Sequence, residues 1–257
     1  MLNLILRSSS VFFFLLFVGN SFGQINQTDA NGLKQGTWVK KFEGKKEIKY
    51  KGKFKDGIPV GVFIFYYESG RVKAKNRYFN DGNDSFVSTY HENGKLMSMG
   101  KYVNKLKDSV WVYLDHYGNY ISKDTYLAGM KHGKCITYYV YNPKIDVGPP
   151  NLLEVTMYKF GEKEGEAMKY YKNGKLLSKA TYVLGSLEGK FITYYPTGKK
   201  KTVIHYKHGV RNGYTLNYDA NEKLTSKQYY RQGFKLEGKK LEEYLERKKK
   251  RAREKKN

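Results

Sequence analysis

Hydrophobic and polar residues alternate along most of the chain, in short segments that end at glycine-containing turns. In the segment that opens at Gly61, the apolar residues Ile64 and Tyr66 stand three and five positions after the glycine, and Phe63 stands between polar or smaller neighbours. Alternation with a period of two is typical of a β-strand, whose successive side chains point to opposite faces. We therefore expect Ile64 and Tyr66 on one face of a strand and Phe63 on the opposite, more variable face.

The alternating segments recur as a tandem unit of about 24 residues. A small residue opens each of eight units: Gly36, Gly61, Ser85, Ser109, Gly133, Gly165, Gly189 and Gly213. An aromatic residue follows near the end of each unit: Phe54, Tyr78, Tyr102, Tyr126, Tyr158, Tyr182, Tyr206 and Tyr230. One interval is eight residues longer, and its extra residues contain Pro149-Pro150, which predicts an insertion loop over 142–151.

Two turns divide each unit. Asn93-Gly94 and Asn173-Gly174 are hairpin signals, because both central residues accept a positive φ, and a second turn such as Ala128-Gly129 closes the unit. Hairpins joined by short turns form an antiparallel meander. We expect an all-β fold, with about eight hairpin repeats over residues 36–237 in one elongated, twisted, antiparallel sheet. Sixteen strands spaced by about 4.8 Å would give a sheet roughly 75–80 Å long.

The N-terminal segment predicts export. Arg7 precedes the apolar run Val11–Val18, and small residues lead to a cleavage site between Gly23 and Gln24, as in a secretory signal peptide over residues 1–23. The apolar run is shorter than the roughly 20 residues that span a bilayer, and an uncleaved anchor is the alternative. We expect a periplasmic, cell-surface or extracellular protein, with residues 24–35 as a polar lead-in loop.

The C-terminal segment 238–257 changes period and predicts a short helix. Leu241, Tyr244 and Leu245 lie on one side of it, so we expect this side to cover the last hairpin. The end of the segment is a basic tail that includes Lys248, Lys249, Lys250, Arg251 and Arg253. Such a tail would add non-specific attraction to an anionic partner.

The unit resembles a known repeat. The segment Gly61–Arg71, with its Tyr66-Tyr67 pair and Ser69-Gly70 turn, recurs at Gly165–Lys175 and Gly189–Lys199. These segments are similar to MORN repeats, in the variant found in many bacterial proteins described as toxin–antitoxin antitoxins. The resemblance covers residues 31 to about 237. It implies a curved sheet of hairpins that binds proteins or lipid surfaces, and neutralisation of a partner toxin is the alternative function.

Composition and motifs favour a binding scaffold over an enzyme. The formal net charge is +24, with 25 tyrosines and one cysteine, Cys135. No nucleophile, metal-site or phosphate-loop motif occurs, so we expect no catalytic residue, no metal, no cofactor and no small-molecule substrate. Cys135 occupies a position held by aromatic or aliphatic residues in other units, which indicates a packed residue.

The charge predicts the class of partner. Because export argues against nucleic acid, we expect a protein partner or an anionic lipid or polysaccharide surface. The candidate binding residues, whose main role we expect to be structural, are Tyr78, Tyr102, Tyr126, Tyr158, Tyr182, Tyr206 and Tyr230. Aromatic cross-strand pairs explain these tyrosines without a ligand.

Overall fold

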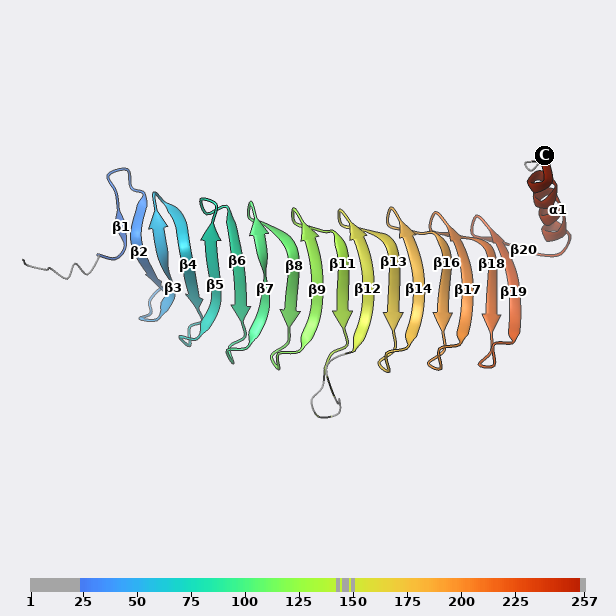
Figure 1. Ribbon diagram of the computed structural model, residues 1–257, viewed down its shortest axis with the longest axis horizontal. Helices are drawn as coiled ribbons and strands as arrows, with labels where there is room; N and C mark the ends of the chain where they lie inside the picture. The colour runs from blue at the N-terminus through green and yellow to red at the C-terminus, as the bar shows by residue number, and fades with distance from the viewer. Residues whose placement is uncertain (1–23, 142–143, 145–147, 149–150, 255–257) are drawn as a thin grey trace, which may run out of the picture.

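The computed structural model describes residues 24–141, 144, 148 and 151–254. The predicted signal peptide and most of the predicted insertion loop lie outside these residues. In the described part, twenty strands form one antiparallel sheet, and a single helix, α1 (Gly238–Glu254), follows it. Figure 1 shows the strands side by side along one long axis, with α1 at the C-terminal end. The predicted fold class is therefore confirmed.

Sixteen long strands pair as eight consecutive hairpins. Their first strands are β2 (Lys34–Lys41), β4 (Ile58–Tyr66), β6 (Asp84–Tyr90), β8 (Leu106–Leu114), β11 (Gly133–Tyr138), β13 (Glu162–Tyr170), β16 (Gly189–Tyr194) and β18 (Val210–Tyr218). Their second strands are β3 (Ile48–Lys55), β5 (Val72–Phe79), β7 (Leu96–Val103), β9 (Tyr120–Leu127), β12 (Leu152–Lys159), β14 (Leu176–Val183), β17 (Lys200–Lys207) and β19 (Leu224–Arg231). The short strands are β1 (Gln27–Thr28), β10 (Met130–Lys131), β15 (Ser186–Leu187) and β20 (Phe234–Leu236).

The two kinds of turn differ from each other in their backbone. Two successive positive φ values occur between units, for example 48° at Ala128 and 84° at Gly129, which is the conformation that suits a two-residue hairpin. Within units, Asn93 is not at positive φ, and only Gly94 is. The Asn93 side chain instead accepts a hydrogen bond from the Lys95 N–H at 3.0 Å and donates one to the His116 carbonyl at 2.7 Å. The expected positive φ at Asn93 and Asn173 is wrong, because a longer turn needs only the glycine.

The residue that opens a unit produces a bulge. Gly61 has a φ of 68°, and the register between β3 and β4 shifts beside it, between Lys51 and Lys53. A positive φ of this kind favours glycine, although Ser109 adopts 59° at the equivalent position. Ser85 does not have a positive φ, and β5 and β6 pair without a shift. The second and third units therefore pair without a bulge, whereas the first and second do not.

The polar lead-in contains structure that the prediction missed. In place of a loop over 24–35, β1 pairs with the beginning of β2. The Asn26 side chain then continues the edge, since it accepts a hydrogen bond from Val39 N–H at 2.7 Å and donates one to Val39 C=O at 3.0 Å. An exposed strand edge invites pairing with other chains, and Asn26 occupies part of this one.

Tyrosine hydroxyls link consecutive units at the longer turns. Tyr67 donates to the Tyr90 carbonyl at 2.7 Å, and Tyr171 makes the same bond to Tyr194, 23 residues further along the chain. A net contribution of about 0.5–1.5 kcal/mol is typical for such a bond. The second tyrosine of the Tyr-Tyr pair therefore holds each hairpin to the next.

Candidate functional site

The register assigns side chains to two faces. Because directly opposed residues of an antiparallel pair share a face, Phe63, its partner Asn76, and Tyr78 lie together on what we call the first face. Ile64 and its partner Lys75 lie on the second face. The separation of Ile64 from Phe63 follows the predicted alternation. Contrary to its description as the more variable side, however, the first face holds deeply packed aromatic rings, with Phe63 and Trp111 each only 3% exposed.

The predicted tyrosines form one row along the first face. All seven are half-buried: Tyr78, Tyr102, Tyr126, Tyr158, Tyr182, Tyr206 and Tyr230. Tyr78 packs edge-on against Phe63, with ring centroids 5.3 Å apart, and Tyr102 packs in the same way against Trp111 at 4.9 Å. These contacts show that the row takes part in the packing of the sheet.

Basic side chains lie over many of these tyrosine rings. Each comes from a strand that precedes the tyrosine in the chain, for example Lys131 over Tyr158, with its Nζ 5.4 Å from the ring centroid, and Lys163 over Tyr182 at 5.0 Å. A cation over a ring contributes about 0.5–2 kcal/mol. Burial, together with the neighbouring Tyr113 hydroxyl, raises the pKa of Tyr126 to about 12. The row is therefore occupied by contacts within the protein.

A partly buried ion pair lies beside Cys135, which replaces the aromatic ring in the fifth unit. Asp124 is 8% exposed, and one of its carboxylate oxygens lies 3.3 Å from Lys131 Nζ. Burial works against the charge of Lys131, but Asp124 holds the pKa of this ammonium above its ordinary value. Burial raises the pKa of the neighbouring Cys135 thiol, which keeps it protonated and unreactive. The position of Cys135 agrees with a packed residue.

The second face carries a group of cations that the sequence analysis did not identify. We call it the basic patch: the exposed Lys51, Lys53, Lys55, Lys75 and Arg77, and the half-buried Lys101. The patch comes from β3, β5 and β7, and the strands between contribute apolar side chains such as Val62 and Phe86, opposite Arg77. None of the ion pairs found among the described residues joins a patch cation to an acid. The alternating lysines of Ile48–Lys55 were the signal that could have revealed it.

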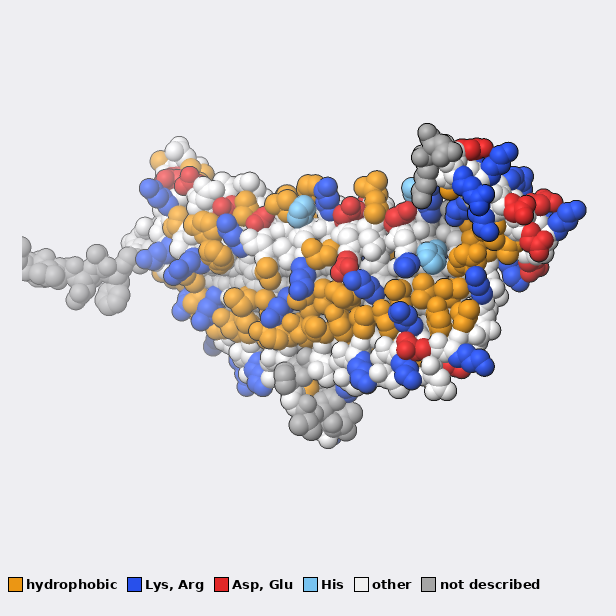
Figure 2. Space-filling model, turned by 45° about the vertical axis from the view of Figure 1, so that its right-hand side comes forward, with side chains coloured by type: hydrophobic (Ala, Val, Ile, Leu, Met, Phe, Trp, Pro, Cys, Tyr) orange, Lys and Arg blue, Asp and Glu red, His pale blue; other side chains and the backbone are white. Residues whose placement is uncertain are grey.

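Exposed apolar side chains accompany the basic patch. Val62 is 45% exposed, Phe86 55%, Met99 45% and Val110 51%, all on the second face. Figure 2 shows hydrophobic side chains in a band along the sheet, with Lys and Arg side chains beside it. A contiguous surface of exposed apolar side chains, bordered by basic ones, is characteristic of an interaction surface.

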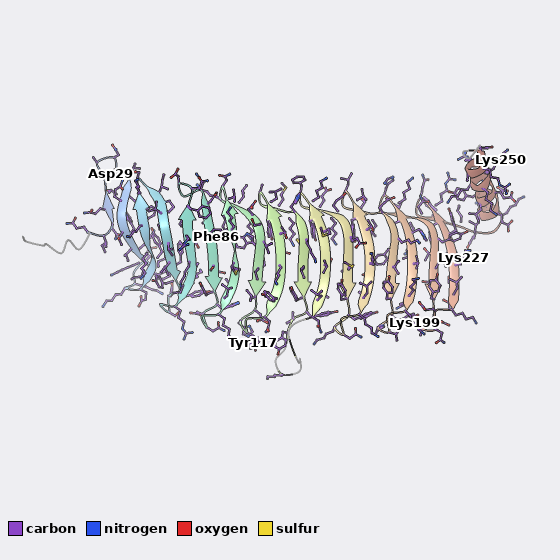
Figure 3. All side chains as sticks on the ribbon, in the orientation of Figure 1. Asp29, Phe86, Tyr117, Lys199, Lys227 and Lys250 are labelled. Atoms are coloured by element: carbon purple, nitrogen blue, oxygen red, sulfur yellow. The ribbon has the colours of Figure 1, made fainter. Side chains whose placement is uncertain are left out.

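The C-terminal helix covers the far end of the second face. Tyr244 of α1 lies 5.6 Å from the ring of Tyr229, which is 2% exposed and pairs with Tyr214. The predicted contact between this helix and the last hairpin is therefore present. The predicted basic tail lies on α1, and its members are exposed: Lys248, Lys249, Lys250, Arg251 and Arg253. Figure 3 labels Lys250 on α1 and Lys227 on β19 beside it.

Among the described residues, no group of three or more His, Cys, Asp or Glu residues could hold a metal ion. No helix of the described part is long and apolar enough to cross a membrane.

Comparison with known families agrees with this geometry. The profile of the MORN repeat variant matches residues 59–81, 87–104, 163–183 and 187–208. Each segment falls on one hairpin of the sheet, in the second, third, sixth and seventh units. The chain is a MORN-repeat-like protein, a class of repeat scaffold that generally mediates binding and is typically non-catalytic. Comparison with curated proteins gives no match.

Proposed function

We propose that the protein is an exported, non-catalytic scaffold whose second face binds an anionic surface of the cell envelope. The observation that carries this proposal is the basic patch. Its cations come from alternate strands, so they stand about 9.6 Å apart across the sheet and about 6.7 Å apart along each strand. A flat array of fixed cations complements a surface of many anionic groups better than it complements a single small ligand.

The electrostatic attraction is sufficient for reversible binding. Each Lys or Arg near an anionic membrane surface contributes about 1 kcal/mol, and the basic patch provides several at once. The exposed side chains of Val62 and Phe86 stand between the cations and can bury apolar area in the same contact. The basic tail on α1 adds attraction at the other end of the second face.

A vesicle experiment tests the proposal. The triple variant Lys51→Glu/Lys75→Glu/Arg77→Glu removes cations from the basic patch. The control variant Lys46→Glu/Lys199→Glu/Lys223→Glu changes the net charge equally, at exposed positions in the longer turns. Co-sedimentation with phosphatidylserine vesicles should weaken by at least about tenfold for the first variant, and far less for the control. Equal losses would show that net charge alone attracts the protein and would refute a defined binding face.

Export is tested separately. The proposal predicts cleavage after Gly23, so the mature chain begins at Gln24. Mass spectrometry of the protein from the cell envelope or medium would show this N-terminus. An intact N-terminus on protein recovered only from the cytoplasm would contradict export.

The alternative function rests on the repeat resemblance alone. Neutralisation of a partner toxin would be favoured if co-expression of the chain rescued growth against a toxin encoded by a neighbouring gene. If the variant Lys51→Glu/Lys75→Glu/Arg77→Glu still rescued growth, toxin neutralisation would not depend on the basic patch and would be distinct from envelope binding.

A further inference from the structure

A trough crosses the first face where the third unit differs from the second and fourth units on either side of it. In the second and fourth units, a glycine on one strand lies beneath an aromatic ring on the next: Gly52 beneath Phe63, and Gly100 beneath Trp111. In the third unit, the corresponding pair is Asn76 and Val87. Since valine is much smaller than either ring, the first face is hollowed between Phe63 and Trp111.

Two adjoining cavities make up this trough. One of about 840 Å³ lies toward the two-residue turns, and one of about 560 Å³ lies toward the longer turns. Asn76, Val87 and Tyr102 line both cavities, so the trough is continuous along the strand direction. Each volume lies within the range of about 300–1,000 Å³ that is typical of ligand sites.

The floor of the trough is small and polar. The register places Ala74, Thr89 and Ser98 in one cross-strand row and Asn76, Val87 and Gly100 in the next. Thr89 and Ser98 satisfy each other through a hydroxyl–hydroxyl hydrogen bond of 2.6 Å. The Asn76 Nδ2 atom donates to the Tyr78 hydroxyl at 3.4 Å, while its Oδ1 atom is buried and has no hydrogen-bond partner among the described residues. A buried acceptor without a partner is unfavourable, so an occupant that donates a hydrogen bond would favour a rotation of the Asn76 side chain that turns Oδ1 into the trough.

Rigid aromatic side chains form the walls. Tyr78 and Tyr102 lie directly opposite Ser85 from its two sides, and Ser85 is 6% exposed. Each tyrosine is held edge-on by a buried ring behind it, Phe63 or Trp111. The walls are therefore ordered before a ligand arrives, which reduces the entropy lost on binding.

We propose that this trough binds a neutral sugar ring within a glycan chain. A pyranose ring has apolar C–H faces that pack against tyrosine rings, and its hydroxyl groups can donate to Asn76 Oδ1 and exchange hydrogen bonds with Ser85. A phosphate or carboxylate group without a proton could not supply the donor that Asn76 needs. The trough is open along its length, so a chain can continue on both sides of the bound ring.

The experiment compares two variants on an array of neutral and acidic glycans. Asn76→Gly/Val87→Trp fills the trough with the glycine–aromatic pair of the neighbouring units and should preserve the fold. Ala180→Gly/Phe191→Trp creates the same pair in the seventh unit as a matched control. Neutral glycans should be retained by the native protein and by the control, and at least about tenfold more weakly by the filled variant. Asn76→Leu, which removes the acceptor, should weaken retention to a similar extent.

Several outcomes would overturn the site. Retention of no glycan, or equal retention by the native and filled proteins, would refute it. Retention of acidic glycans alone, abolished by substitutions in the basic patch, would assign the binding to the second face instead. Capture of extended peptides in the trough, without glycans, would also refute a sugar site. Because the trough variants leave the second face intact, this result is independent of vesicle binding.

Discussion

Trp111 and Val110 are neighbours on β8, yet Trp111 is 3% exposed and Val110 is 51% exposed. They differ because Trp111 points to the first face, where Tyr102, Tyr113 and the backbone of Gly100 surround it. Val110 points to the second face, where its partner is Thr125 and solvent covers the rest. A single-layer sheet has no second layer to bury its core, so one face packs against itself and the other stays available.

The largest effect should come from the packed face. Replacement of Trp111 by alanine removes a buried ring and should lower the free energy of unfolding by about 3–5 kcal/mol. Val110→Ala, one residue away on the other face, should change it by less than about 0.5 kcal/mol. Chemical denaturation of the two variants measures both values. Similar losses would mean that both faces contribute equally to cohesion.

A smaller loss should follow from filling the space beneath the ring. A Cβ atom at Gly100 would overlap the Trp111 side chain, so Gly100→Ala should destabilise by about 1–3 kcal/mol. In the double variant Gly100→Ala/Trp111→Val, the smaller side chain removes the overlap. The free energy of unfolding of this double variant should fall by less than the sum of the losses in the single variants Gly100→Ala and Trp111→Val, because the two residues are in contact. Simple additivity in thermal denaturation would contradict the packing described for this pair.

The repeat and the places of its turns could be predicted from the sequence. Which face of the sheet packs and which stays exposed could not. Period-two alternation places Phe63 and Ile64 on opposite faces, which is correct, yet it does not say which face will bury its side chains. That depends on Gly52, a residue on the preceding strand, because only a glycine there lets the Phe63 ring lie against the backbone. A residue's neighbours across strands follow from register, and the bulge beside Gly61 shifts that register.

The basic patch and the trough were missed for the same reason. Lys51 and Lys75 are 24 residues apart and read as separate solvated lysines until the sheet places them on alternate strands of one face. Nothing in the sequence distinguishes Asn76 or Val87. They become informative only when the register shows that they occupy the positions of the glycine and the aromatic residue of the neighbouring units. The tyrosine row, in contrast, could be located because its members recur every 24 residues, apart from the one interval that contains the insertion.

A moderate effect should come from the hydrogen bonds between units. Tyr171→Phe keeps the ring but removes the hydroxyl that donates to the Tyr194 carbonyl. The free energy of unfolding should fall by about 0.5–1.5 kcal/mol, and amide exchange should accelerate near the turns of the sixth and seventh units. Tyr170→Phe, whose hydroxyl faces only the Met168 sulfur at 3.5 Å, is the control. An equal loss of stability in both variants would mean that the hydrogen bonds from tyrosine hydroxyls to the next unit do not hold the units together.

The smallest effect should appear only at high pH. Burial raises the pKa of Tyr126 to about 12 and, with help from Tyr244, that of Tyr229 to about 12. The unfolded chain ionises near pH 10, so it loses protons before the folded state does. The stability from these groups is complete below about pH 10 and declines as the pH rises toward 12. Phenolate absorbance should show two fewer late-titrating tyrosines in Tyr126→Phe/Tyr229→Phe, and an unchanged titration curve would contradict this assignment.

The division between the two faces is tested most directly by a fluorophore placed on each. The native thiol is first removed by Cys135→Val, because valine stands at the equivalent position 87 of the third unit. An environment-sensitive dye is then attached to a single introduced cysteine, either Val62→Cys on the second face or Lys40→Cys on the first. On addition of phosphatidylserine vesicles, the emission of the dye at position 62 should shift to the blue and that at position 40 should stay unchanged. A shift at position 40 without one at position 62 would contradict the account.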